Sequence, residues 1–340
     1  MSIEITHSFS KRLLSWGNKQ GRFGLPWHPE KGERFDAYKI WVSEIMLQQT
    51  QLKTVLPYFK NFIIAFPTIQ DLAKSNIEDV LFQWSGLGYY RRAINLHKSA
   101  RKICNKEKVK YPKTASEWSK LPGIGSSTAS AISSFVNSER VPILDSNVLR
   151  VLSRRYKIER NLKLVSEQKE VFKKALELIP MEKKLVPLYS QFIMDLGSII
   201  CKPVNPECSI CPVSTDCGAY RENKINSFPF IYKKLLKHNT INWLICLNEN
   251  LIILERQKIG ALWGGLWTPQ KIINKKKLSA NVKLMQAKKL YISNYYLTLN
   301  VWMSKKMIIF PGSEIELFNF NDLNSLEIPS VFKSFLSKLN

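Results

Sequence analysis

Glu44 stands in sequence surroundings that suit acid catalysis. Trp41 precedes it and Ile45 follows it. An apolar environment favours the protonated form of a carboxyl group, and a carboxyl group that stays protonated near neutral pH can act as a general acid. The alternative interpretation places Glu44 on the polar face of a helix, together with Ser43 and Gln48.

Asp145 stands directly before a stretch with helical character that begins near Ser146. An Asp at this position ordinarily caps the helix through hydrogen bonds to free backbone N–H groups. Its carboxylate also suits the stabilisation of the positive charge that develops on a sugar when a glycosidic bond breaks. The two roles are compatible, so Asp145 is a candidate catalytic residue as well as a predicted N-cap.

The cysteines point to a second kind of chemistry. Cys104 and Cys246 stand alone and are predicted to be ordinary buried residues, whereas four others are closely spaced: Cys201, Cys208, Cys211 and Cys217. Four thiolates so close together suit either a tetrahedral zinc ion or a 4Fe-4S cluster, and the spacing does not choose between them.

A Pro-Gly-x-Gly turn at 122–125 separates two stretches with helical character. Glycine lets the backbone come close to a ligand, and the free N–H groups at the start of the following helix bind phosphate without reading base sequence. A purely structural helix-turn-helix would contain the same residues. The candidate phosphate-binding residues are Gly123, Ile124, Gly125 and Ser126.

Charge favours a polyanionic partner. The 340 residues include 51 Lys and Arg against 27 Asp and Glu, which gives a formal net charge of +24. Such a chain attracts nucleic acids. We see no secretory signal pattern and no apolar run long enough to span a bilayer, so we expect a cytoplasmic protein, associated with the nucleoid in a bacterium, without a membrane partner. In that reducing compartment the cysteines are expected to bind metal or to remain thiols.

Two kinds of domain are expected to position these residues. Segments with helical periodicity and short turns predict an all-helical region at 1–222. A linker follows at 223–234. Segments such as 240–247, 251–254 and 295–302 are rich in strand-forming residues, and they predict a smaller α+β domain at 235–340.

The segments 41–51, 86–93, 121–129 and 143–147 and the cysteine loop, in this order, resemble adenine DNA glycosylases of the MutY type. That family belongs to the helix-hairpin-helix superfamily, which also contains endonuclease III. The resemblance implies a six-helix barrel with the hairpin at about 30–135 and an iron-sulfur helical domain formed by 1–29 and 136–222. It also implies that 235–340 is a Nudix-like domain that recognises 8-oxoguanine.

The resemblance further implies an activity, a cofactor and catalytic roles. The substrate would be double-stranded DNA with adenine mispaired with 8-oxoguanine or guanine, and the cofactor one 4Fe-4S cluster on the four clustered cysteines. Glu44 corresponds to the glutamate that protonates adenine, at N7, and then helps to place the attacking water. Asp145 corresponds to the aspartate that stabilises the oxocarbenium-like sugar or a short-lived covalent adduct, and Asn147 orients it.

Adenine must leave the base stack to be reached, so a pocket and a wedge are needed. The resemblance assigns pocket positions to Leu25, Trp27, Leu47 and Gln191. It assigns Gln49, Thr50, Leu87 and Tyr89 either to a wedge that opens the duplex or to contacts with the orphaned guanine. For the aromatic and leucine positions, plain core packing is the alternative.

Some positions depart from relatives. Ser127 stands where strand-cleaving members of the superfamily carry a Lys that forms a Schiff base, and a hydroxyl cannot form an imine, so we expect a monofunctional glycosylase. Ser293, between Ile292 and Asn294, is the counterpart of a serine that senses 8-oxoguanine, but the flanking aromatic and His are changed, which predicts weaker discrimination against guanine. Leu149 stands where some relatives have Lys. The acidic helix of true Nudix hydrolases is missing after 261–270, so pyrophosphate hydrolysis is not expected.

Two other functions stay open at this point. An endonuclease III-like pyrimidine glycosylase with lyase activity is disfavoured by Ser127 and by the added C-terminal domain. A non-catalytic iron-sulfur DNA-binding protein is disfavoured by Glu44 and Asp145. We expect a monomer, because a two-fold partner would have to avoid the DNA-facing surface.

Overall fold

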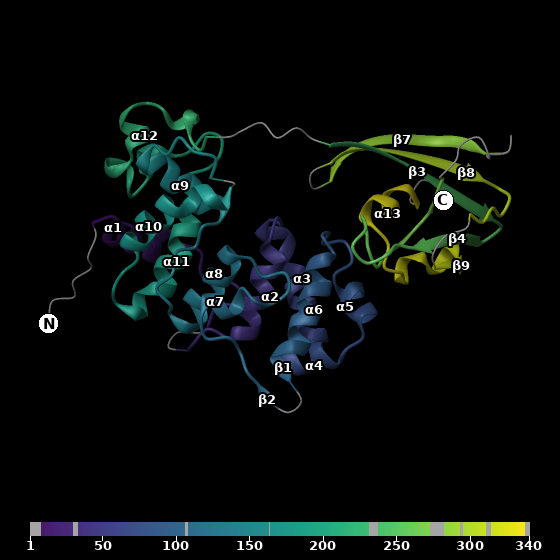
Figure 1. Ribbon diagram of the computed structural model, residues 1–340, viewed down its shortest axis with the longest axis horizontal. Coiled ribbons are helices and arrows are strands. Elements are labelled where there is room, and N and C mark those ends of the chain that lie inside the picture. The colour runs from purple at the N-terminus through teal and green to yellow at the C-terminus, as the bar shows by residue number, and fades with distance from the viewer. Residues whose placement is uncertain are drawn as a thin grey trace. The chain divides into compact units, whose positions relative to one another are not determined.

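A computed structural model of the chain describes residues 8–29, 33–105, 108–162, 164–230, 237–272, 282–292, 295–310 and 314–336. The chain forms two compact units. One consists of residues 1–74 and 98–233, and the other of residues 75–97 and 234–340. Figure 1 labels the helices and strands of both.

The first unit is mainly helical (Figure 1). Its α-helices are α1 (Ser8–Gln20), α2 (Ala37–Leu47), α3 (Leu52–Ala65), α4 (Ile69–Lys74), α7 (Ala115–Trp118), α8 (Ser126–Asn137), α9 (Ser146–Tyr156), α10 (Lys169–Leu178), α11 (Val186–Asp195) and α12 (Gly218–Arg221). A π-helix, η3 (Leu196–Ile200), continues α11. Short 3-10 turns are η1 (Val165–Gln168), η2 (Lys183–Leu185), η4 (Cys208–Ile210), η5 (Ser214–Asp216) and η6 (Ile225–Ser227). No helix in the described ranges is long and apolar enough to cross a membrane.

Helix α2 is buried on nearly every side. Its buried residues are Tyr38, Ile40, Trp41, Val42, Ser43, Ile45 and Met46. A helix that is apolar all round belongs in a protein interior. The carboxylate of Asp36 starts the helix by accepting hydrogen bonds from the backbone N–H groups of Tyr38 (2.8 Å) and Lys39 (3.0 Å). Glu44 therefore lies in the protein interior because the apolar residues around it on α2 are buried.

A second group of helices packs around one apolar core. Phe9 and Leu13 of α1, Val151 of α9, Val171 of α10 and Phe192 of α11 are buried in the same cluster. Each helix contributes residues spaced three or four apart, which places them on one face. Cys201 and Cys211 also pack against this cluster. The core thus fixes the start of α9, the end of α11 and part of the cysteine loop.

The helical region contains one departure from the all-helical prediction for 1–222. Strands β1 (Cys104–Asn105) and β2 (Lys108–Val109) pair antiparallel, with Cys104 opposite Val109. Two-residue strands are too short to leave an alternating pattern in the sequence. Cys104 is only partly buried there, so its predicted burial was wrong.

The second unit is built on a mixed sheet. Its strands are β3 (Lys237–Asn248), β4 (Leu251–Arg256), β5 (Trp267–Thr268), β6 (Gln270–Lys271), β7 (Lys283–Ile292), β8 (Tyr295–Ser304) and β9 (Ile315–Asn319). The strand order is β5-β4-β3-β8-β7, with β6 paired to β3 and β9 paired to β4. Strands β3 and β8 run parallel, and the other pairs are antiparallel. Helices α5 (Ile77–Gln83) and α13 (Ser330–Leu336) and the 3-10 segment η8 (Phe320–Ser325) complete this unit, and α6 (Arg91–Ile103) begins in it.

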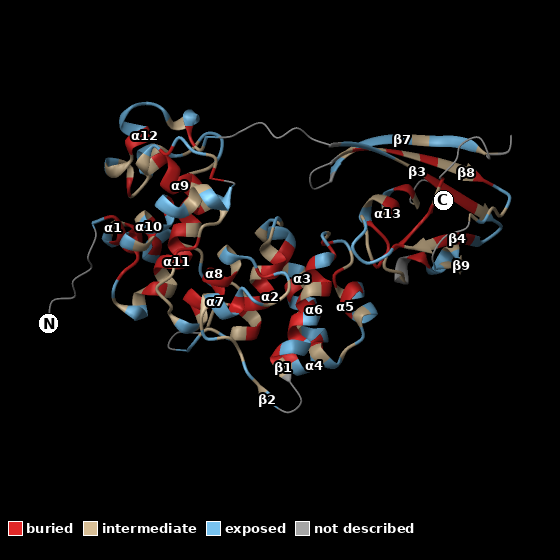
Figure 2. Cartoon of the chain, viewed as in Figure 1, coloured by how far each residue is buried: buried red, intermediate tan, exposed pale blue. Residues whose placement is uncertain are grey.

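Strand β3 is the buried centre of the sheet. Trp243 and Ile245 join one apolar cluster, which includes Phe332 of α13, while Leu244 and Cys246 join another. This alternation is the two-residue period of a strand buried on both faces. Figure 2 shows the central part of β3 buried, β8 alternating between buried and intermediate residues, and β7 largely exposed. The smaller α+β domain predicted for the C-terminal third is confirmed, as is the burial of Cys246.

Residues 75–97 belong to the second unit through side-chain contacts with the C-terminal part. Arg256 pairs with Glu78 of α5 (3.0 Å) and with Glu314 (3.5 Å). Lys333 Nζ donates to Ser85 Oγ at 3.1 Å. The predicted subdivision of the helical region and the predicted linker at 223–234 stay predictions.

Candidate active site

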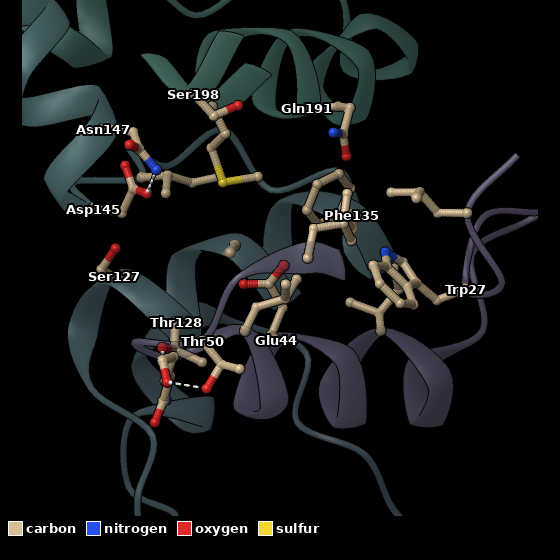
Figure 3. Close-up of a pocket in the computed structure, with 18 of the residues that line it drawn as sticks. Trp27, Glu44, Thr50, Ser127, Thr128, Phe135, Asp145, Asn147, Gln191 and Ser198 are labelled. Carbon is tan, nitrogen blue, oxygen red and sulfur yellow. Dashed lines mark hydrogen bonds between the residues drawn. The ribbon is translucent and has the colours of Figure 1, made fainter. Parts of the chain in front are cut away.

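A cavity of about 550 Å³ opens in the first unit (Figure 3). It is lined by α2, α8, the start of α9, α11 and η3, and by the loops at 22–28 and 48–52. It collects these predicted site residues: Leu25, Trp27, Glu44, Leu47, Gln49, Thr50, Ser127, Asp145, Asn147 and Gln191. Residues that lie up to about 170 positions apart in the sequence thus surround one space.

Glu44 points from α2 into this cavity (Figure 3). Its side chain is enclosed by protein except where it faces the cavity, and it makes no hydrogen bond to another described residue. Burial and, to a smaller extent, the negative charge of Asp145 raise the pKa of Glu44 to about 7, against the opposing positive charge of Arg22. A carboxyl group in this state holds a proton near neutral pH and can give it to a bound base.

Asp145 faces the same cavity and is held at the start of α9. Its carboxylate accepts hydrogen bonds from the Val148 backbone N–H (2.7 Å) and from Asn147 Nδ2 (3.0 Å). The pKa of the Asp145 carboxyl is raised because burial outweighs the opposing effects of these two donors and of the charge of Arg150. The predicted N-cap is confirmed, and the same hydrogen bonds favour the anion.

Hydrogen bonds from Arg150 fix the position of Asn147. Its Nη2 donates to Asn147 Oδ1 (2.9 Å) and to the Gly197 carbonyl (2.7 Å), and its Nε donates to the Cys201 carbonyl (2.7 Å). A Cβ atom at position 197 would lie 2.6 Å from Asn147 Cβ, so only glycine lets η3 approach α9 this closely. Asn147 therefore has one amide orientation, with its nitrogen toward Asp145.

An ion pair between the partly exposed Arg22 and the buried Asp195 lies on another wall and fixes Gln191. Asp195 is fully buried and accepts hydrogen bonds from the Arg22 backbone N–H (2.9 Å), from Arg22 Nε (2.5 Å) and from Gln191 Nε2 (2.9 Å). Because a carboxylate only accepts, the Gln191 amide must turn its nitrogen toward Asp195. His28 lines the cavity nearby, and burial lowers the pKa of its imidazole, which favours the neutral ring.

Sequence analysis did not identify Arg22, His28, Asp195 or Arg150. Two of these positions carried a usable signal. Asp195 follows Gln191 by four residues and Arg150 follows Asn147 by three, so each pair shares a helix face. Arg22 and His28 lie in a loop, where no periodicity marks them.

Trp27 supplies an apolar wall. Its side chain is 4% exposed and packs edge to face against Phe59, with 4.9 Å between ring centroids. Leu25 and Leu47 lie beside the same cavity and are partly exposed. Trp27 is thus packed against the protein interior, while Leu25 and Leu47 are accessible from the cavity.

The predicted hairpin lies between α7 and α8. Gly123 has φ 78°, and Gly125 caps α8 in an extended conformation with open space where a side chain would be. Ile124 is buried and anchors the turn. The backbone N–H groups at the start of α8, beginning with Ser126, are therefore accessible to a phosphate.

The four clustered cysteines line one small cavity together with Arg154. Arg154 Nη1 lies 3.3 Å from Cys201 Sγ and donates to the Lys202 carbonyl at 2.7 Å. Burial raises the pKa of Cys211 to about 12 and also raises the pKa values of Cys208 and Cys217. Across the described ranges, no group of three or more His, Cys, Asp or Glu side chains is arranged to hold a metal ion.

Three predicted site residues lie elsewhere. Leu87 and Tyr89 belong to the second unit and do not line the cavity. Tyr89 is 46% exposed, whereas Leu87 is buried. Ser293 lies outside the described residues.

Comparison with known proteins identifies the family. Residues 42–181 match the family described as HhH-GPD superfamily base excision DNA repair protein. An adenine DNA glycosylase of Buchnera aphidicola subsp. Schizaphis graminum is 40% identical over 76% of this chain and 73% of its own length. That of Buchnera aphidicola subsp. Baizongia pistaciae is 35% identical over 97% of this chain and 96% of its own length. The chain belongs to the adenine DNA glycosylase family.

Solved structures agree on the helical fold. A thermostable thymine-DNA glycosylase is 25% identical and matches with a TM-score of 0.55 over 63% of this chain and 95% of its own. Endonuclease III in a non-covalent complex with DNA is 18% identical and matches with a TM-score of 0.52 over 66% of this chain and 98% of its own. The helical glycosylase fold is thus shared, while the sequence relatives indicate an adenine DNA glycosylase, an N-glycosylase of base excision repair.

Proposed function

We propose that this adenine DNA glycosylase removes adenine mispaired with 8-oxoguanine or guanine in double-stranded DNA and leaves the strand uncut. The observation that carries the proposal is the pairing of two unlike carboxyl groups in one cavity. Burial raises the pKa of Glu44 to about 7, and Asp145 is held by two hydrogen-bond donors. One group suits proton donation and the other suits stabilisation of positive charge.

The chemistry follows from these positions. An adenine flipped out of the duplex enters the cavity against Trp27. Glu44 gives its proton to a ring nitrogen, N7, so that the base leaves as a neutral molecule. The Asp145 carboxylate, oriented by Asn147, faces the positive charge on the sugar. Glu44, now ionised, accepts a proton from the water that attacks the sugar carbon.

Ser127 supports a reaction without strand cleavage. Its hydroxyl cannot form the imine through which a lyase cuts the strand. No lysine stands among the described residues that line the cavity. The abasic site is therefore the expected product.

DNA binding would use several surfaces. The backbone N–H groups of Gly123, Gly125 and Ser126 suit a backbone phosphate, whereas that of Ile124 donates to the Leu121 carbonyl at 3.3 Å, and the net charge of +24 attracts the duplex. Gln49, exposed with φ 58°, and Thr50 lie at the mouth of the cavity. We assign Tyr89 and Leu87 to the wedge and Ser293 of the Nudix-like C-terminal domain to the contact with 8-oxoguanine.

The four cysteines fit an iron-sulfur cluster better than a single zinc ion. One shared cavity is surrounded by Cys201, Cys208, Cys211 and Cys217. A single tetrahedral ion requires ligands that converge on one point, and these four side chains are not arranged in that way. A 4Fe-4S group bound there would tie the end of η3 to the loop that ends at α12.

We also propose that the enzyme acts as a monomer in the cytoplasm. The helical region divides, in this proposal, into the barrel at about 30–135 and the iron-sulfur domain formed by 1–29 and 136–222.

A duplex with a single adenine opposite 8-oxoguanine or guanine tests the proposal. After incubation, alkali is added to half of each sample. Breakage only after alkali is the expected result. Breakage without alkali would overturn the monofunctional assignment, and binding without breakage in either half would leave a non-catalytic DNA-binding protein. Thymine glycol duplexes serve as the comparison for a pyrimidine-specific enzyme.

A further inference from the structure

The turn at residues 86–90 has an unusual backbone. Gly86, Gly88 and Tyr89 have φ values of 97°, 78° and 51°. Glycine adopts positive φ without penalty, but tyrosine rarely does. Tyr89 nevertheless stands 46% exposed at the end of this turn. A strained, exposed aromatic residue requires neighbours that hold it, and such strain is typical of functional sites.

Arg92 lies beneath the turn and holds it. Its side chain is buried, and its Nη2 donates to the carbonyl oxygens of Gly88 (3.0 Å) and Leu87 (3.5 Å). The guanidinium carbon lies 5.4 Å from the ring centroid of Trp84 and 5.5 Å from that of Tyr89. The cation thus contacts both aromatic rings and the backbone between them.

Two further hydrogen bonds close the turn. Trp84 Nε1 donates to the Gly88 carbonyl at 3.2 Å, and the Gly86 backbone N–H donates to Tyr90 Oη at 3.1 Å. Burial lowers the pKa of Arg92 to about 10, which leaves the guanidinium charged at neutral pH. The turn therefore has its shape before any DNA is bound.

We propose that Arg92 is a positioning residue for mispair recognition, because it fixes the 86–90 turn so that Tyr89 is displayed ready to enter the base stack. This inference rests on the proposed wedge role of Tyr89. A preformed wedge avoids the cost of ordering the loop when DNA binds. A preformed wedge strengthens binding to duplexes that must be unstacked. Arg92 therefore contributes to the difference in affinity between mispaired and fully paired DNA.

Arg91 provides a matched control. It is the preceding residue on α6, carries the same charge and is exposed. Arg91→Met and Arg92→Met therefore remove the same charge from neighbouring positions. Both are made in the full chain carrying Glu44→Gln, so that the mispaired duplex is bound without being consumed.

Dissociation constants are then measured for a duplex with adenine opposite guanine and for the fully paired duplex. We expect Arg92→Met to weaken binding of the mispaired duplex about tenfold, the worth of lost charge-assisted hydrogen bonds, and to change paired binding little. Arg91→Met should weaken both equally. Arg92→Lys keeps the charge but loses the planar fork, so it should behave like Arg92→Met, and it serves as the test variant if thermal unfolding shows that Arg92→Met is not folded.

A double-mutant cycle with Tyr89→Ala separates positioning from a general structural effect. If Arg92 acts through Tyr89, Arg92→Met should add nothing to the loss caused by Tyr89→Ala. A 2-aminopurine base beside the mispair gives a second readout, because its fluorescence rises when its neighbour is unstacked. That rise should be lost in Arg92→Met and kept in Arg91→Met.

The outcomes distinguish the inference from the function on which it rests. If Tyr89→Ala leaves the discrimination between mispaired and paired DNA unchanged, the wedge assignment fails. If Tyr89→Ala abolishes discrimination while Arg92→Met and Arg92→Lys keep it, or if the losses are additive, the wedge stands and the positioning role of Arg92 is overturned.

Discussion

Two carboxyl groups, those of Glu44 and Asp145, face the same cavity but have different surroundings. Glu44 lies in the middle of α2, among buried apolar residues, without a hydrogen-bond donor in the described part of the chain. Asp145 lies at the first turn of α9 and receives two hydrogen bonds. Burial raises the pKa of both carboxyl groups, but only Asp145 has donors that favour its anion. The position of each residue in its helix thus decides which carboxylate receives hydrogen bonds from the described residues: Asp145 does, and Glu44 does not.

Replacing the acid should have the largest effect. Glu44→Gln keeps the size of the side chain but removes the transferable proton, so we expect adenine release to fall about 10³-fold. Single-turnover release from a mispaired duplex measures the change, with binding of the same duplex as the control. Activity within a few fold of the unaltered chain would remove Glu44 from the mechanism.

Neutralising the anion should come next. Asp145→Asn loses the charge that faces the sugar, and the expected fall in release is about 10²-fold. Asparagine caps helices as well as aspartate does, so the unfolding temperature should hardly move. A large drop in that temperature would mean that Asp145 serves the fold more than the chemistry.

The pH profile tests the electrostatic link between the two groups. Glu44 must be protonated and Asp145 ionised, so single-turnover release should fall about tenfold per pH unit above the Glu44 pKa of about 7 and should fall again at low pH, where Asp145 takes up a proton. The negative charge of Asp145 raises the pKa of Glu44. In Asp145→Asn the midpoint should therefore move to lower pH, and an unmoved midpoint would show that the groups do not interact.

The smallest expected effect comes from the residue that orients Asp145. Asn147→Leu removes the hydrogen bond to Asp145 Oδ2 and the acceptor for Arg150. The loss of one such bond predicts a fall in release of about fivefold, with binding unchanged. Leu149→Met, two residues further along α9 at a side chain that packs against the apolar core and makes none of these hydrogen bonds, is the control, and equal losses in both variants would contradict the positioning role.

Local patterns singled out the two carboxyl groups of the candidate site, whereas the other predicted residues that line its cavity were assigned through the family resemblance. Apolar neighbours around Glu44 marked a buried carboxyl group, and the position of Asp145 before a helix marked an N-cap. The strands at 240–247 and 295–302 were predicted from their composition and are present in β3 and β8. Each of these inferences depends on residues close together in the chain.

Contacts between distant segments could not be predicted in this way. Asp195 meets Arg22 across 173 positions, and nothing in the loop around Arg22 indicates its partner. The pairing of β3 with β8 in parallel likewise joins segments that are far apart. Tyr89 has a positive φ and its ring lies 5.5 Å from the Arg92 guanidinium carbon, but side-chain patterns in the sequence do not report backbone conformation.

The close approach of Gly197 to Asn147 has a consequence for inheritance. Any other residue at position 197 would push against Asn147 at 2.6 Å, although position 197 is not among the residues that line the cavity. Under the proposed function, an adenine left opposite 8-oxoguanine directs thymine into the next copy, so a G:C pair becomes T:A. A cell with such an allele would accumulate these transversions although none of the residues that line the cavity is altered, and sequencing its descendants would reveal the defect.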